Sequence, residues 1–106
     1  MVNKNFRKAI QAYGEDHDLE IKILDNHAYD KSVVGITEDG RLIYSYEKMI
    51  EEFAEDEECP MEEAIEWVEY NTLRAIPYFG EGAPIIVYDS ISTILEIYGD
   101  TEACIS

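Results

Sequence analysis

Acidic side chains dominate one stretch of the chain, and they are the groups whose types and spacing suggest chemistry. From Ser45 to Tyr70 there are eleven acids against one base, Lys48. Two rows recur at close to helical spacing: Glu51, Glu55 and Glu58, and then Glu62, Glu66 and Glu69. Helix neighbours at i and i+4 lie about 5–6 Å apart at Cβ. The stretch is therefore expected to present closely spaced carboxylates on a rigid scaffold.

Such rows can imitate the backbone of a nucleic acid. Duplex DNA carries a charge about every 3.4 Å along each strand, so carboxylates on helices can take the places of phosphates in a basic groove. A solvated helix face that keeps the protein in solution is the alternative, and the sequence leaves both open. The candidate partner-binding residues are Glu51, Glu52, Glu55, Asp56, Glu57, Glu58, Glu62, Glu63, Glu66 and Glu69.

Carboxylates can also perform acid–base catalysis or hold a metal, but the patterns for these are missing. Glycoside hydrolysis needs two carboxyl groups facing across a cleft, one of them desolvated, and these acids are expected at the surface. The sequence has neither an EF-hand loop nor the Glu-x-x-His pairing of di-iron bundles. His17 and His27 stand alone in polar links. We expect no catalytic residue, no metal site and no cofactor, and hence no enzyme.

One base stands apart in a mostly apolar run, YNTLRAIPY, within this acidic half. Arg74 is expected to form an ion pair with a nearby carboxylate, such as Glu69 or Glu81. The alternative is a secondary binding surface made by Arg74, Tyr78 and Phe79.

Composition places the whole chain, residues 1–106, in one domain of ordinary apolar content (46 %) but extreme net charge (−16). Residues 47–106 carry sixteen acids and two bases, against eight acids and six bases in residues 1–46. Nucleic acids and anionic membranes bind basic patches, so neither is an expected partner.

No apolar run approaches the roughly 20 residues of a membrane span, and no secretory signal is evident. Cys59 and Cys104 are expected to be free thiols in a reducing cytoplasm, with a disulfide as the alternative.

Hydrophobic periodicity predicts the helices that position these side chains. A first helix is expected over Asn3–Glu15. Ser45 is expected to cap a second, whose apolar stripe is Tyr46, Met49, Ile50, Phe53 and Ala54. Pro60 is placed to begin a third, which buries Met61, Ala64, Ile65, Val68 and Thr72 and stops at Pro77. A final amphipathic segment, Ile91–Tyr98, matches helix spacing, with a strand as the alternative.

Strands are expected over Leu19–Leu24, Ser32–Thr37, Arg41–Tyr44 and Ile85–Tyr88, the last buried on both faces. An Asp-Gly pair between two apolar runs predicts a hairpin turn at Gly40. The predicted class is α+β: a small antiparallel sheet, an N-terminal helix, and an acidic helix hairpin packed on the sheet.

The segments GITEDGRLIYSYEKMIEEF and EAIEWVEYNTLRAIPYFGEGAPIIVY resemble a group of short uncharacterised proteins from phages and mobile elements of Gram-positive bacteria. The resemblance spans Val33 to Tyr88 and includes the NT-x-R-A-x-P-Y junction. It brings no catalytic residue with it. It implies an anti-defence role, and the chain is similar in charge and size to small acidic anti-CRISPR proteins that mimic nucleic acids.

These observations lead to the hypothesis of a non-enzymatic inhibitor in the cytoplasm of a bacterial host. It would bind the basic nucleic-acid groove of a defence nuclease through its acidic helices, as a monomer or a homodimer. The alternative is a structural or regulatory interaction module of a phage or mobile element, which binds through the apolar surface of residues 78–87.

Overall fold

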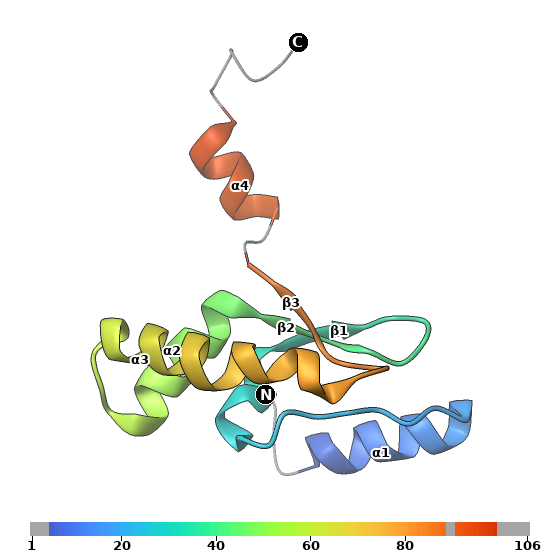
Figure 1. Ribbon diagram of the computed structural model, residues 1–106. Helices are drawn as coiled ribbons and strands as arrows, with labels where there is room; N and C mark the ends of the chain where they lie inside the picture. The colour runs from blue at the N-terminus through green and yellow to red at the C-terminus, as the bar shows by residue number, and fades with distance from the viewer. Residues whose placement is uncertain (1–4, 89–90, 100–106) are drawn as a thin grey trace.

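The computed structural model describes residues 5–88 and 91–99. Its elements in chain order are α1 (Phe6–His17), η1 (His27–Ser32), β1 (Val33–Ile36), β2 (Leu42–Ser45), α2 (Tyr46–Glu57), α3 (Met61–Trp67), η2 (Val68–Thr72), η3 (Leu73–Phe79), β3 (Ile85–Val87) and α4 (Ile91–Tyr98). Here η1 and η3 are 3₁₀ helices, and η2 is a π helix. The predicted α+β class is confirmed, and α4 stands apart from the other elements beyond β3 (Figure 1).

The predicted hairpin is confirmed. Strands β1 and β2 pair antiparallel, with Ile36 opposite Leu42. The turn between them needs a glycine, because Gly40 has φ of +88° and a side chain is strained there. A Cβ at this position would also lie 3.1 Å from Leu19 Cδ1. The turn closes with the Gly40 N–H donating to the Thr37 carbonyl at 3.0 Å.

The sheet is mixed, so the prediction of a purely antiparallel sheet was wrong. Strand β3 pairs with β2 in parallel, with Ile43 opposite Ile85, and the strand order is β1-β2-β3. Parallel neighbours require a long crossover, usually helical, and the segment from α2 to η3 is that crossover. As an edge strand, β3 is half-buried at Ile85 and Ile86 and exposed at Val87, which also corrects the expectation that it is buried on both faces.

The predicted strand at Leu19–Leu24 is absent. This segment belongs to neither a helix nor a strand and runs alongside α1 (Figure 1). Lys22 in its middle is half-buried, and its Nζ donates to the carbonyls of Phe79 at 2.5 Å and Glu81 at 2.7 Å. Burial does not alternate along this segment, since Ile21, Lys22 and Ile23 are all half-buried, and it pairs with neither edge strand, β1 or β3.

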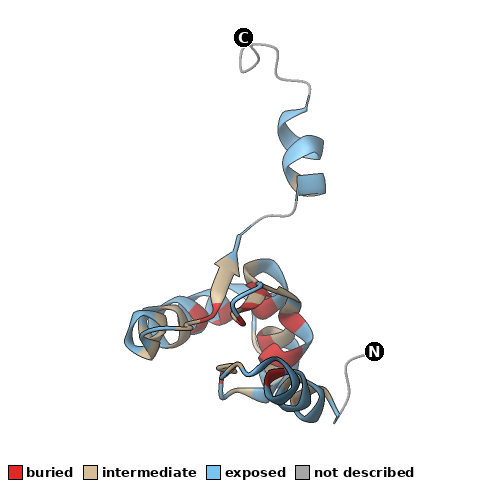
Figure 2. Cartoon of the chain, turned by 90° about the vertical axis from the view of Figure 1, so that its right-hand side faces the viewer, coloured by how far each residue is buried: buried red, intermediate tan, exposed pale blue. Residues whose placement is uncertain are grey.

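The core forms where η1, β2, α2 and the α3–η2 helix meet. Its buried hydrophobic side chains are Leu24, Tyr29, Leu42, Tyr44, Met49, Ile50, Phe53, Ala64 and Val68. They gather in one region of the molecule, whereas α4 has none (Figure 2). The stripe predicted for the second helix is confirmed by Met49, Ile50 and Phe53.

The third helix buries less than predicted. Ala64 and Val68 are fully buried, but Met61 is 49 % exposed and Ile65 is 38 % exposed. Helix α2 contacts β2, η1 and α3, whereas α3 contacts α2 and η2. Helix α3 therefore packs mainly on α2. Because a single neighbouring helix covers it, α3 buries a narrower apolar face than the stripe in its sequence predicts.

The helical path does not stop at Pro77, contrary to prediction. The Leu73 N–H donates to the Val68 carbonyl, five residues back, which is the π turn of η2. The chain then continues as 3₁₀ helix to Phe79, with Pro77 inside it. A proline lacks a donor, but its φ of about −65° fits 3₁₀ geometry. The helix ends at Gly80, where φ is +74°.

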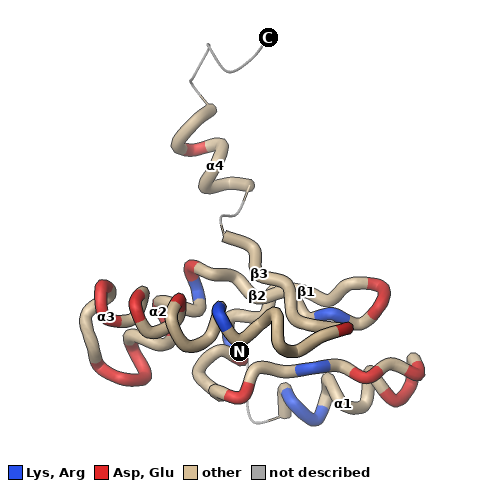
Figure 3. The backbone as a smooth tube through the Cα atoms, in the orientation of Figure 1, with Lys and Arg blue, Asp and Glu red and all other residues tan. Residues whose placement is uncertain are grey.

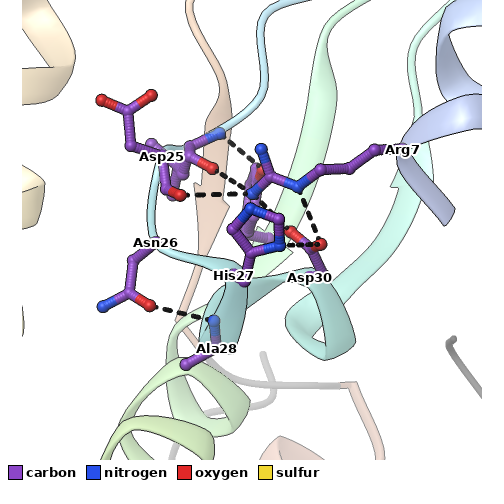
Figure 4. Close-up of polar contacts among 8 residues, drawn as sticks. Arg7, Asp25, Asn26, His27, Ala28 and Asp30 are labelled. Carbon is purple, nitrogen blue, oxygen red and sulfur yellow. Dashed lines mark hydrogen bonds and ion pairs between the residues drawn. The ribbon is translucent and has the colours of Figure 1, made fainter. Parts of the chain in front are cut away.

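Helix α1 ends at His17, two residues after the predicted end at Glu15, and its predicted start at Asn3 lies outside the described residues. An ion pair joins α1 to η1. The Arg7 guanidinium donates to both carboxylate oxygens of Asp30 at 2.9 Å and to the Leu24 carbonyl at 2.7 Å (Figure 4). Asp30 is buried, and its hydrogen bond is the main cause that raises the pKa of Arg7. Arg7 therefore has a structural role, in which it holds α1 against η1.

Candidate functional site

The acidic candidates on α2 lie on its outward face. The Ser45 side chain caps this helix by accepting from the Lys48 N–H at 3.3 Å, as predicted. Glu51 and Glu55 are exposed. Glu52 differs, because it is half-buried and lies 3.9 Å from Lys31 Nζ. Glu52 is thus partly neutralised within the molecule.

The end of α2 is unfavourable for its own helix. Asp56 and Glu57 occupy the last turn, which holds no base, although the negative end of the helix dipole favours cations there. Glu58 follows with φ of +54° and ψ of +49°, the left-handed conformation that usually selects glycine at a helix C-terminus. Four consecutive residues from Glu55 to Glu58 therefore carry negative charge where local stability favours lysine, arginine or glycine.

The acids of the α3–η2 helix are exposed, but one is engaged. Glu62, Glu63 and Glu66 face solvent. Glu69 accepts a hydrogen bond from the Tyr46 hydroxyl. Burial and this hydrogen bond raise the pKa of Tyr46 to about 12. Glu69 thus joins the start of α2 to η2.

Eight of the ten candidates are left without an internal partner for their carboxylates within residues 5–88 and 91–99. They are Glu51, Glu55, Asp56, Glu57, Glu58, Glu62, Glu63 and Glu66. Figure 3 shows the acidic segments of α2, α3 and their connecting turn together, with a second acidic group around the end of α1 and the β1–β2 turn. The predicted rows lie on two separate helices, because the chain turns at Glu58.

A groove that the sequence did not predict lies between these helices. It has a volume of about 620 Å³. Its lining consists of Asn26, Phe53, Glu57, Cys59, Glu63, Glu66, Trp67, Tyr70 and Asn71. Five of these, Glu63, Glu66, Trp67, Tyr70 and Asn71, follow the i, i+3, i+4, i+7, i+8 spacing of one helix face. That spacing is the sequence signal for the groove, and the apolar stripe beside it, which includes Ala64 and Val68, marks the buried face of the same helix.

The three secondary candidates differ in exposure, since Arg74 and Tyr78 are exposed and Phe79 is half-buried. Arg74 makes no ion pair with Glu69 or Glu81; its guanidinium carbon lies 4.9 Å from the centre of the Tyr70 ring. Tyr78 is 89 % exposed, whereas Phe79 is half-buried and packs against the core. The expected ion pair is therefore replaced by a cation–π contact.

The remaining polar groups offer little chemistry. His17 stacks on Tyr13, and His27 lies 3.9 Å from an Asp30 oxygen. Burial raises the pKa of the half-buried Cys59 thiol, and the charges of Glu63 and Glu57 raise it further. Cys104 lies outside the described residues.

The described part of the chain has neither a metal-binding cluster nor a membrane-spanning helix. No cluster of three or more His, Cys, Asp or Glu side chains is arranged to hold a metal ion there. No helix among the same residues has the length and apolar character needed to cross a lipid bilayer.

Comparison with known proteins returned no match among family models, curated proteins or solved structures.

Proposed function

We propose that this protein is a non-enzymatic inhibitor that binds the basic nucleic-acid groove of a bacterial defence nuclease through the acidic surface of α2 and α3. It acts in the cytoplasm of the host and needs no cofactor. The acids occupy the places of phosphates and exclude the nucleic acid by competition. Steering between opposite charges makes the association fast and sensitive to salt.

The observation that supports this proposal most is the end of α2. The last turn of α2 holds acids and no base, which the helix dipole opposes, and Glu58 adopts a φ of +54° that aspartate, as at Asp18 of α1, tolerates better than glutamate does. Local rules are broken most often at functional sites. We infer that the function of this surface, the run Glu55–Glu58 together with the unpaired acids of α3, requires its negative charge.

Capture from a bacterial lysate at low salt, followed by a salt gradient and DNA competition, tests the proposal. The parent is expected to retain a nucleic-acid-binding protein that DNA displaces. Replacing Glu55, Glu58, Glu62 and Glu66 by Gln should abolish retention. A matched control replaces four exposed acids elsewhere, Glu15, Glu20 and Glu38 by Gln and Asp16 by Asn, and should retain it.

Two results contradict the proposal. If the first quadruple variant binds as well as the parent, the acids of α2 and α3 do not make the contact. If both quadruple variants lose binding equally, retention reflects net charge and not this surface.

A second candidate, an interaction module that binds through residues 78–87, draws support from Tyr78, whose side chain is 89 % exposed. In that case Tyr78→Ala should abolish partner capture while the quadruple Gln variant keeps it. Tyr13→Ala, at an exposed tyrosine on α1, is the control. Phe79 is unsuitable for this test because it packs against the core.

A further inference from the structure

The groove between α2 and the α3–η2 helix combines an aromatic wall with a carboxylate rim. Trp67 stacks on Phe53 with ring centroids 5.7 Å apart and planes inclined by 19°. Phe53 is 6 % exposed and Trp67 is 49 % exposed, so the inner ring supports the outer one and leaves it accessible. Tyr70 lines the same groove, one helical turn further along. The wall thus offers flat aromatic surface to a ligand.

Three carboxylates surround this wall. Glu57 comes from α2, and Glu63 and Glu66 come from α3. Each is exposed, and none has an ion-pair partner in the part of the chain that the structure describes. A purely apolar ligand would desolvate these charges without compensating them, and an anion would be repelled. The groove is therefore complementary to a cation with an apolar or planar body.

The chain itself shows how one of these rings receives a cation. The Arg74 guanidinium lies over the Tyr70 ring, 4.9 Å from its centre. Guanidinium groups stack on aromatic faces and at the same time donate to carboxylates through a planar fork. A lysine ammonium is more strongly hydrated and lacks the planar fork. The combination of ring and carboxylate suits arginine better than lysine.

The backbone of this wall is also unusual. Tyr70 and Asn71 lie in the π turn of η2, and π turns within α-helices are rare and frequent at functional sites. The groove volume of about 620 Å³ lies within the range of ligand sites. It accommodates an arginine side chain together with part of the segment that bears it.

We propose that this groove receives an arginine side chain from a basic segment of a protein partner. The guanidinium stacks on Trp67 and donates to Glu63 and Glu66. The proposal rests on the proposed function in one respect, since it names the side chain that the acidic surface would engage. Selection for arginine, rather than for positive charge in general, is what it adds.

The test uses Trp67 as an internal probe, because it is the only tryptophan in the sequence. Hexa-arginine and hexa-lysine peptides are titrated at equal ionic strength while Trp67 fluorescence is recorded. Hexa-arginine should change the fluorescence and bind roughly threefold to tenfold more tightly than hexa-lysine. Glu63→Gln with Glu66→Gln should remove most of this preference. Glu15→Gln with Glu20→Gln, which changes the net charge equally outside the groove, should keep it.

A Trp67→Leu variant, measured by anisotropy of labelled peptides and checked for folding by circular dichroism, should bind the two peptides about equally. Equal binding of both peptides by the parent would overturn the proposal. So would equal losses in the groove and control variants, because binding would then follow net charge. Displacement of hexa-arginine by monomeric arginine amide at the same molar concentration would overturn the assignment to a protein segment.

Failure of this inference is distinguishable from failure of the proposed function. Trp67→Leu leaves all the carboxylates in place. If this variant captures the nuclease as well as the parent does, the groove does not contribute to binding, and the proposed charge mimicry is unaffected. If DNA displaces no captured protein but the preference for hexa-arginine persists, the groove is supported as an arginine site and the proposed function is contradicted.

Discussion

At the scale of single residues, two acidic side chains occupy backbone conformations that favour glycine. Glu58 ends α2 with φ of +54°, and Asp18 ends α1 with φ of +59°. The left-handed conformation costs an L-residue about 1–2 kcal/mol, and aspartate tolerates it better than most residues do. The two positions form a natural pair, because one lies in the candidate interface and the other does not.

Glu58→Gly is expected to raise the free energy of unfolding by about 1 kcal/mol, because it removes left-handed strain. Asp18→Gly should give a smaller gain. Urea unfolding with a shared m-value measures both. Only Glu58→Gly should also weaken partner capture. A loss of stability in Glu58→Gly would show that the glutamate is held by contacts that offset its strain.

Tyr44 connects the core to the extended segment before η1. Its ring is fully buried, and its hydroxyl accepts from the Leu24 N–H at 3.0 Å. Burial raises the pKa of Tyr44 to about 12 from its ordinary value of 10. Because the folded-state pKa lies above the unfolded one, this residue stabilises the fold fully below pH 10 and loses that contribution as the pH rises to about 12.

Comparison with Tyr44→Phe isolates this effect, since the other tyrosines titrate in both proteins. The variant should be less stable below pH 10, because the Leu24 N–H loses its acceptor. The stability difference between parent and variant should shrink by roughly 2 kcal/mol between pH 9 and pH 12. Urea unfolding at several pH values measures it. A difference that does not change with pH would contradict the prediction.

At the scale of elements, one ion pair holds α1 to the rest of the molecule. Asp30→Asn keeps the shape of the side chain but removes the charge that Arg7 faces. It is expected to reduce the free energy of unfolding by about 1–3 kcal/mol, as for other hydrogen bonds to charged groups.

The control for this change is Asp25→Asn, because the Asp25 carboxylate points away from Arg7 (Figure 4) and the residue is exposed. It should change stability by no more than about 0.5 kcal/mol. Hydrogen exchange of the α1 amides should accelerate in Asp30→Asn only. Equal effects of the two substitutions would mean that general charge, and not this contact, determines stability.

At the scale of the whole molecule, the net charge of −16 meets little internal compensation. Within residues 5–88 and 91–99, only Arg7–Asp30 and Lys31–Glu52 join a lysine or arginine to a carboxylate within 4.0 Å. Self-repulsion at this charge destabilises the compact state, and salt screens it.

Raising NaCl from 0.01 M to 0.5 M should therefore stabilise the fold. A gain of about 1 kcal/mol corresponds to a rise in Tm of roughly 4–8 °C for a domain of this size. The quadruple Gln variant of α2 and α3 should gain less, because it has less repulsion to screen. Differential scanning calorimetry measures both. A fall in Tm with salt would show that attractive pairs outweigh the repulsion.

Local sequence signals predicted the elements that depend on neighbours in the chain. The Asp-Gly turn, the Ser45 cap and the stripe of Met49, Ile50 and Phe53 all act over a few residues, and all three were confirmed. The final helix over Ile91–Tyr98 also has the predicted bounds. The predictions at Leu19–Leu24 and Pro77 were wrong, because a strand forms only by pairing with a distant strand, which this segment does not do, and a proline can be accommodated in a 3₁₀ turn.

The sequence by itself determined the α+β class, the helix that presents the acids and the excess of negative charge, because composition and short-range periodicity specify these. Only the tertiary structure decided that β3 runs parallel to β2, that Glu52 and Glu69 are engaged internally, and that Trp67 stacks on Phe53 beside unpaired carboxylates. Each of these joins residues far apart in the chain, and their meeting depends on how α2 packs against η1 and α3 and on where β3 returns to the sheet. The hydrophobic periodicity within one helix or strand contains no information about which distant residues it will contact.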